Sequence, residues 1–237
     1  MNTYYDSPTG RYGQQDALAQ RVSLIMKRVY FKMFLAMIVS GLTAWYMASS
    51  VAVMTFFANH TWMSWVIFGA ELILVMSISG GINRMSSATA TLLFYLFAIV
   101  NGAMLFPIIY AYSGVSIAKT FFITAGVFGA MSVYGYFTNR DLSRMGSILM
   151  MCLFGLIIVS LVNIFLHSST LQWIISAVGV LIFIGLTAWD TQQVKRMAAT
   201  MPQEYTSKMA TLGALTLYLD FINLFLFLLN FLGGSRN

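Results

Sequence analysis

The stretch Leu217-Tyr218-Leu219-Asp220-Phe221-Ile222-Asn223-Leu224-Phe225 places a carboxylate inside the last long apolar run of the chain. A charged side chain at the centre of a bilayer is costly unless it is paired, hydrated or protonated. A chain keeps such a group when it handles ions or protons, or when the group fixes a contact between helices. Asp220 is therefore the first candidate functional residue, and the apolar run around it is the first candidate membrane span.

The composition extends this interpretation to the whole chain. Of its 237 residues, 59% are hydrophobic and 8% are charged, and the mean hydropathy is +0.79. A soluble domain has about 25% charged residues, so these few charges cannot cover a water-facing surface. The net charge of +6 does not indicate a nucleic-acid partner, because the basic residues are spread over several loops. Cys152 is the single cysteine, which excludes an internal disulfide framework.

A helical span needs about 20 predominantly apolar residues, and the chain contains seven candidates. They cover about 30–51, 61–82, 88–112, 116–137, 145–166, 171–192 and 209–232. The predicted fold is an all-α integral membrane protein, a seven-transmembrane helix bundle over residues 30–232. We predict a polar, disordered cytoplasmic tail over residues 1–29, because residues 2–15 are rich in Tyr, Ser, Gly and Gln. Residues 233–237 are predicted to form a short external tail.

The basic residues predict the orientation of the bundle. With the N-terminus inside, all but two of the 13 Lys and Arg residues lie on the inner side. The inner ones are Arg11, Arg21, Lys27, Arg28, Lys32, Arg84, Arg140, Arg144, Lys195, Arg196 and Lys208, and the outer ones are Lys119 and Arg236. By the positive-inside rule this asymmetry places the N-terminus in the cytoplasm and the C-terminus outside.

Four ionisable residues form the candidate site. Glu71 and Asp220 lie near the middle of the second and seventh predicted spans, and Asp190 lies near the inner end of the sixth. Arg84 ends the second span on the same inner side. The depths of Asp190 and Asp220 agree within about two helical turns, so the two aspartates can face each other. The candidate polar partners of Glu71 are Asn101, Asn163 and Asn223.

Two carboxylates in a low-dielectric site cannot both ionise cheaply, so Asp190 and Asp220 would share a proton and titrate as a coupled pair. The protonated pair is a hydrogen bond that holds spans six and seven together. The ionised pair repels itself and attracts a cation, and its hard oxygen ligands suit a transient Ca²⁺ site. Arg84 can compete by bridging one carboxylate. The simpler alternatives are an interfacial helix cap for Asp190, a neutral packing group for Asp220 and a topology anchor for Arg84.

Five segments resemble motifs of the Bax inhibitor (transmembrane Bax-inhibitor-motif) family, in its bacterial branch. The longest and most specific is Thr216 to Phe225, Thr-Leu-Tyr-Leu-Asp-Phe-Ile-Asn-Leu-Phe. The others are Asn101-Gly102-Ala103-Met104-Leu105-Phe106-Pro107, Asn139-Arg140-Asp141-Leu142-Ser143, Val162-Asn163-Ile164-Phe165 and Ala188-Trp189-Asp190-Thr191-Gln192. They occur in the family's order, and the resemblance covers roughly residues 20–232.

The resemblance implies a bundle in which the last helix is central and wrapped by the other six. It also implies a pH-sensitive calcium leak of the bacterial inner membrane, gated by two aspartates that match Asp190 and Asp220. The family's latching arginine matches Arg84, and its acidic residue in helix two matches Glu71. Glu71 and Asn223 are then candidates for an ion pathway. Calcium is expected as the permeant ion, the bilayer as the surroundings, and no cofactor is expected.

Of two other function classes, modulation of a protease remains open, whereas an intramembrane protease fails on its motif. Some bacterial members of the resembled family modulate a membrane-bound AAA protease, and here the tail 1–29 would supply the contact. An intramembrane aspartyl protease would carry a Gly-x-Gly-Asp motif. Asp220 follows Leu217-Tyr218-Leu219 and Asp190 follows Thr187-Ala188-Trp189, so we do not expect an enzyme. The sequence also contains no phosphate loop and no zinc motif.

Overall fold

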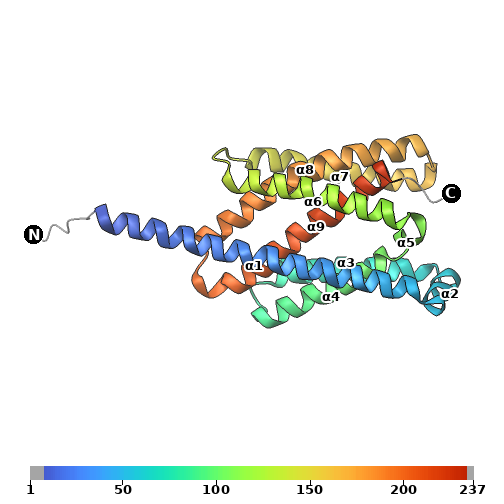
Figure 1. The fold of residues 1–237 in the computed structure, drawn as a ribbon, viewed down its shortest axis with the longest axis horizontal. Coiled ribbons are helices and arrows are strands. Elements are labelled where there is room, and N and C mark those ends of the chain that lie inside the picture. The colour runs from blue at the N-terminus through green and yellow to red at the C-terminus, as the bar shows by residue number, and fades with distance from the viewer. Residues whose placement is uncertain (1–7, 234–237) are drawn as a thin grey trace, which may run out of the picture.

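The computed structural model describes the backbone of residues 8–233 and, within that range, the side chains of residues 16–202 and 204–233. All regular elements in this part of the chain are helices, as predicted (Figure 1). They are α1 (Pro8–Ser49), α2 (Val51–Asn59), α3 (Trp62–Gly81), α4 (Ser87–Leu105), α5 (Ile108–Ala111), α6 (Gly114–Phe137), α7 (Ser143–Leu166), α8 (Ser169–Thr200), the 3-10 helix η1 (Gln203–Tyr205) and α9 (Thr206–Leu232).

Six stretches in the described residues are long and apolar enough to cross a membrane. They are Trp62–Gly81, Ser87–Ala111, Gly114–Phe137, Ser143–Leu166, Ser169–Thr200 and Thr206–Leu232. The first predicted span, 30–51, falls in the second half of α1, with Lys32 near the start of the span. The Nζ of Lys32 donates to the hydroxyls of Thr91 at 2.8 Å and Thr211 at 2.6 Å. α1 packs against α4 and α9, so it completes a bundle of seven long helices in the described residues.

Helix α9 is the centre of the bundle. In its most apolar stretch 67% of the residues are buried, whereas the corresponding shares for α3 and α7 are 6% and 11%. Figure 1 shows α1, α3 and α4 on one side of α9 and α6, α7 and α8 on the other. The main neighbours of α9 are α1, α4, α6 and α8, while α3 packs on α4 and α7 packs on α8. The expectation that all six other helices wrap α9 is thus refined to four neighbours and two outer helices.

Serines in the short connections fix where several helices begin. Ser50, Ser86, Ser113 and Ser168 are the N-caps of α2, α4, α6 and α8, and each side chain accepts a hydrogen bond from the backbone three residues on. Such a cap satisfies an otherwise unpaired N–H and contributes about 1 kcal/mol. The left-handed φ of 51° at His167 ends α7 directly before the cap of α8.

The predicted disordered tail is wrong for the described part of residues 1–29, because α1 begins at Pro8; residues 1–7 lie outside the described residues. The side chains of Val22, Ile25, Met26 and Val29 are buried in the bundle core. Their spacing is that of one helix face. Burying this face stabilises the helical conformation although the residues before it are polar.

One predicted boundary also changes. The sequence predicts an end of the sixth span at 192, but α8 continues to Thr200 because Val194 and Ala198 extend its buried face. The predicted third span, 88–112, agrees with the apolar stretch Ser87–Ala111, within which α4 ends at Leu105. Pro107 lacks the backbone N–H that a continuing helix needs, and it becomes the N-cap of the short α5. Of the predicted external tail 233–237, only Gly233 lies within the described residues, as the C-cap of α9.

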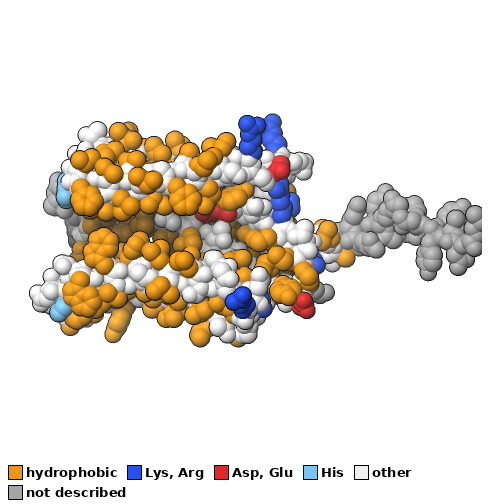
Figure 2. Space-filling view, turned by 180° about the vertical axis from the view of Figure 1, so that it is seen from behind, with side chains coloured by type: hydrophobic (Ala, Val, Ile, Leu, Met, Phe, Trp, Pro, Cys, Tyr) orange, Lys and Arg blue, Asp and Glu red, His pale blue; other side chains and the backbone are white. Residues whose placement is uncertain are grey.

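The surface is apolar along the bundle and basic at one end. Figure 2 shows hydrophobic side chains covering the visible helices, with Lys and Arg side chains gathered at the end from which α1 projects. Histidine side chains lie at the opposite end of the same face (Figure 2). This is the distribution that the positive-inside rule requires of a protein whose basic end faces the cytoplasm.

Candidate functional site

The structure brings Asp190 and Asp220 together. Asp190 lies on α8 and Asp220 on α9, and these two helices pack closely against each other. The two carboxyl groups lie close enough to interact directly. Asp220 is only 4% exposed and Asp190 is partly buried. The depth argument from the sequence therefore leads to a direct contact between two acids inside the bundle.

The contact has a chemical requirement. An ionised carboxylate can only accept hydrogen bonds, so a hydrogen bond between two carboxyl groups needs a proton on one of them. The Oδ2 of Asp220 is buried and has no donor among the other described residues. A proton shared between Asp190 and Asp220 would give the pair a hydrogen bond and leave it with one negative charge. The arrangement can hold a proton, release it, and change its net charge by one unit.

Glycines allow the helices around Asp190 to approach closely. Gly135 of α6 lies against the backbone of Ala188, and Gly146 of α7 lies against the ring of Trp189. A Cβ at either position would overlap those atoms. α8 is thus clamped between α6 and α7 directly before Asp190, which fixes the direction in which the carboxyl group points.

The remaining predicted site residues lie elsewhere. Arg84 is exposed in the connection between α3 and α4, and none of the hydrogen bonds or ion pairs of the described residues joins its side chain to Asp190 or Asp220. Asn223 donates from Nδ2 to the Leu219 carbonyl at 2.8 Å, within its own helix. It lines a cavity of about 300 Å³ between α7, α8 and α9 together with Ser160. Neither residue belongs to the aspartate pair in this arrangement.

Glu71 belongs to a second polar centre. Its Oε1 accepts from Asn101 Nδ2 at 2.8 Å, so Asn101 is the partner among the three candidate asparagines. The Tyr218 hydroxyl donates to Asn101 Oδ1 at 2.7 Å and lies 2.7 Å from Ser40 Oγ. The Ser40 hydroxyl also lies 2.7 Å from the Ala98 carbonyl oxygen. This chain of hydrogen bonds, which we call the Glu71 network, joins α1, α3, α4 and α9.

Tyr218 and Ser40 were not identified from the sequence. Tyr218 precedes Asp220 by two residues, which puts the two side chains on nearly opposite faces of one helix. α9 therefore carries the aspartate pair on the face toward α8 and the Glu71 network on the face toward α1 and α4. A tyrosine two residues from a buried acid was the available signal, but spacing alone does not identify partners on other helices.

Replacing Tyr218 by phenylalanine is expected to lower stability modestly. The change removes one buried hydroxyl and leaves Asn101 Oδ1 without its donor. One such hydrogen bond typically contributes about 1 kcal/mol to the free energy of unfolding. Thermal unfolding in detergent measures the effect. Tyr112→Phe is the matched control, since its hydroxyl donates to Asn230 Oδ1 at 3.1 Å in an exposed position. Equal midpoints for the two variants would contradict a structural role for the network.

The Asn139–Ser143 motif forms a clasp at the basic end. Gln192 donates from Nε2 to the Arg140 carbonyl at 2.8 Å and accepts from the Leu142 N–H at 3.0 Å. Arg196 donates to Asp141 Oδ1 at 2.7 Å and to Ser143 Oγ at 2.9 Å. The backbone N–H of Ser143 and then Arg196 lower the pKa of Asp141 to about 2. The clasp ties the α6–α7 connection to α8 two residues beyond Asp190.

The described residues hold no group of three or more His, Cys, Asp or Glu side chains that could bind a metal ion. Ca²⁺ takes six to eight oxygen ligands, and two carboxyl groups supply a minority of them. A passing ion at the pair would keep most of its water.

The comparisons with known proteins identify one family over almost the whole chain. The family model described as "Inhibitor of apoptosis-promoting Bax1" matches residues 22–237. The chain is 44% identical over 233 residues to the inner membrane protein YbhL of Escherichia coli, covering 95% of this chain and 99% of that protein. It is 45% identical over 213 residues to an uncharacterised protein of Rickettsia prowazekii, covering 90% of each. The match spans both aspartates and the Glu71 network, and the chain belongs to the Bax inhibitor family.

Proposed function

We propose that the protein is a proton-regulated cation leak of the inner membrane, permeable to Ca²⁺, in which Asp190 and Asp220 form the gate. The observation that carries the proposal is the carboxyl pair inside the bundle, with Asp220 on the central helix α9 and Asp190 on its neighbour α8. Among the described residues no cation pairs with either carboxyl group. A pair of acids without a counter-ion is a strong perturbation in an apolar bundle, and it points to protons or cations as the missing partners.

The proposed gating follows from the charge of the pair. With one proton between them, the carboxyl groups hold α8 to α9 by a charge-assisted hydrogen bond. Without it, two negative charges at hydrogen-bonding distance repel each other by several kcal/mol in a medium of intermediate dielectric. With two protons, the pair loses the charge that attracts a cation. Each titration step therefore alters either the α8–α9 contact or the attraction for an ion.

The relatives and the charge distribution support the proposed location and orientation. YbhL is named as an inner membrane protein, and the basic end of the bundle fits the cytoplasmic side. α1 projects from that end and α9 finishes at the other (Figure 1), so an N-terminus inside and a C-terminus outside require an odd number of crossings. Seven long helices meet this requirement.

The test is calcium flux into liposomes. Purified protein is reconstituted with an internal calcium indicator, and flux is followed between about pH 5 and pH 8, where a coupled carboxyl pair can titrate. The proposal expects a protein-dependent flux that changes with pH. Flux equal to that of empty liposomes at every pH would contradict it. Replacing Ca²⁺ by Na⁺ or K⁺ in the same vesicles tests the permeant ion.

Modulation of a membrane-bound AAA protease is the second candidate, and one observation favours it: the start of α1 extends beyond the bundle (Figure 1). The structure changes how this idea is tested. Deleting residues 1–29 would remove Val22, Ile25, Met26 and Val29 from the core. Deleting residues 1–15 leaves the core intact, and unchanged co-purification with such a protease would exclude the tail as the contact.

A further inference from the structure

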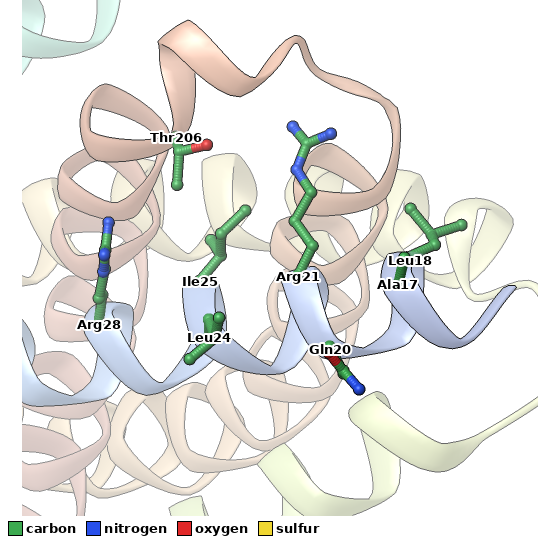
Figure 3. Close-up of a pocket in the computed structure, with 8 residues that line it drawn as sticks. All are labelled: Ala17, Leu18, Gln20, Arg21, Leu24, Ile25, Arg28 and Thr206. Carbon is green, nitrogen blue, oxygen red and sulfur yellow. The ribbon is translucent and has the colours of Figure 1, made fainter. Parts of the chain in front are cut away.

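A pocket of about 640 Å³ lies beside α1 at the basic end of the bundle, away from the aspartate pair. Its lining includes Arg21, Ile25 and Arg28 of α1, and Thr206 at the start of α9. Figure 3 shows the side chains of Arg21 and Arg28 on the side of α1 that faces the connection between α8 and α9. The two arginines are seven residues apart, which is two helical turns, so they line the same face.

The guanidinium of Arg21 is incompletely satisfied. Its Nη2 donates to the Met201 carbonyl oxygen, whereas its Nε is buried and has no hydrogen-bond partner among residues 16–202 and 204–233. A buried donor without an acceptor costs free energy comparable to a lost hydrogen bond. An oxygen-bearing group in the pocket would remove that cost.

The surroundings of the pocket favour an anion. No carboxylate in the described part of the chain forms an ion pair with Arg21 or Arg28. Glu204 of η1 is exposed and pairs with no described cation. The pocket also borders the N-terminus of the 27-residue helix α9. The N-cap residue of this helix is Tyr205, and its side chain does not accept a capping hydrogen bond. The N-terminal end of a helix carries partial positive charge.

We propose that this pocket binds a phosphate group, with the headgroup of an anionic phospholipid as its source. Guanidinium groups match phosphate geometry through paired N–H donors. Leu18 and Leu24, which also line the pocket, are 43% and 57% exposed and provide an apolar margin for acyl chains. The pocket lies at the basic end, where the bundle would meet the anionic inner leaflet.

The test compares lipid binding between two double variants of the full chain. Arg21→Gln with Arg28→Gln removes the pocket's charges, while Arg140→Gln with Arg144→Gln removes two exposed charges from the same end of the bundle. Binding of phosphatidylglycerol and of phosphatidylcholine to the detergent-solubilised protein is titrated by native mass spectrometry. Each arginine should contribute roughly fivefold to the affinity for an anionic lipid. We therefore expect the pocket variant to bind phosphatidylglycerol at least about tenfold more weakly than the unmodified protein. The control variant should stay within about twofold of the unmodified protein.

Arg28→Gln alone is a second test that should not disturb folding. Arg28 is exposed, and its side chain makes no hydrogen bond to another described residue. It should weaken phosphatidylglycerol binding about fivefold with an unchanged unfolding midpoint. Sodium phosphate is titrated as a second probe to distinguish the sources. Phosphate binding that is lost in the pocket variant, without any preference for phosphatidylglycerol over phosphatidylcholine, would support the phosphate site but overturn the lipid as its source. Equal lipid binding by the pocket variant, Arg28→Gln and the control would overturn the proposal.

Discussion

Replacing Asp220 by asparagine is expected to remove most of the pH response of calcium flux. Asparagine keeps the size of the side chain and can still hydrogen-bond to Asp190, but it cannot release a proton. The pair then loses its shared proton, and Asp190 titrates beside a neutral amide. A response of about tenfold between pH 5 and pH 8 in the unmodified protein corresponds to about 1.4 kcal/mol of differential stabilisation. In the variant we expect it to fall below about twofold, as measured by indicator flux in liposomes.

Asp141→Asn is the matched control for this experiment. Asp141 is exposed at the basic end, and its pKa of about 2 keeps it ionised over the whole range of the assay. Because its folded-state pKa lies below the ordinary value of 3.8, any stability it contributes is lost only as the pH falls from about 4 through about 2. The control variant should therefore keep the full pH response.

The two aspartates should also behave as one unit. Asp190→Asn is expected to reduce the pH response as much as Asp220→Asn, and the double variant should be no worse than either single variant. Effects that do not add are the signature of residues that act through one shared interaction. Additive losses, or a full response in Asp220→Asn, would contradict the coupled-pair gate. A leak without pH dependence would then leave the two acids with separate packing roles.

The sequence predicted the features that depend on one helix at a time. Span positions follow from runs of apolar residues, and the depth of Asp190 and Asp220 follows from counting along α8 and α9. The helical start of α1 was missed because the polar residues 2–15 outweighed the spacing of Val22, Ile25, Met26 and Val29, which was already that of a buried helix face.

The Glu71 network could not be predicted, because it depends on how helices rotate against each other. Ser40 and Tyr218 are 178 residues apart in the chain, and their hydroxyls meet only after α1, α4 and α9 have packed. Spacing along one helix identifies the face on which a residue lies but not the helix that this face meets. The same limit explains why Glu71 had three possible asparagine partners. It also explains why the sequence predicted the end of the bundle at which Arg84 lies but not that its side chain stays away from the aspartates.

Replacing Gly135 by alanine is expected to lower stability more than the loss of the Tyr218 hydroxyl does. A Cβ on Gly135 would overlap the carbonyl oxygen of Ala188 and lie 2.9 Å from its carbonyl carbon and 3.0 Å from its Cα. These are backbone atoms of α8, so no side-chain rotation relieves the overlap and the two helices must separate. Overpacking of this kind costs roughly 1–3 kcal/mol, against the ~0.5–1 kcal/mol that alanine contributes over glycine within a helix.

Gly129→Ala is the control on the same helix. An added Cβ there meets no heavy atom within 4 Å, so the higher helix propensity of alanine should leave this variant as stable as the unmodified protein or slightly more stable. Thermal unfolding in detergent, followed by tryptophan fluorescence, should place Gly135→Ala roughly 5 °C below Gly129→Ala. Since Ala188 is two residues from Asp190, separating α6 from α8 should also displace the gating carboxyl group. A Gly135→Ala protein with the same midpoint as Gly129→Ala would contradict the close packing of α6 against α8.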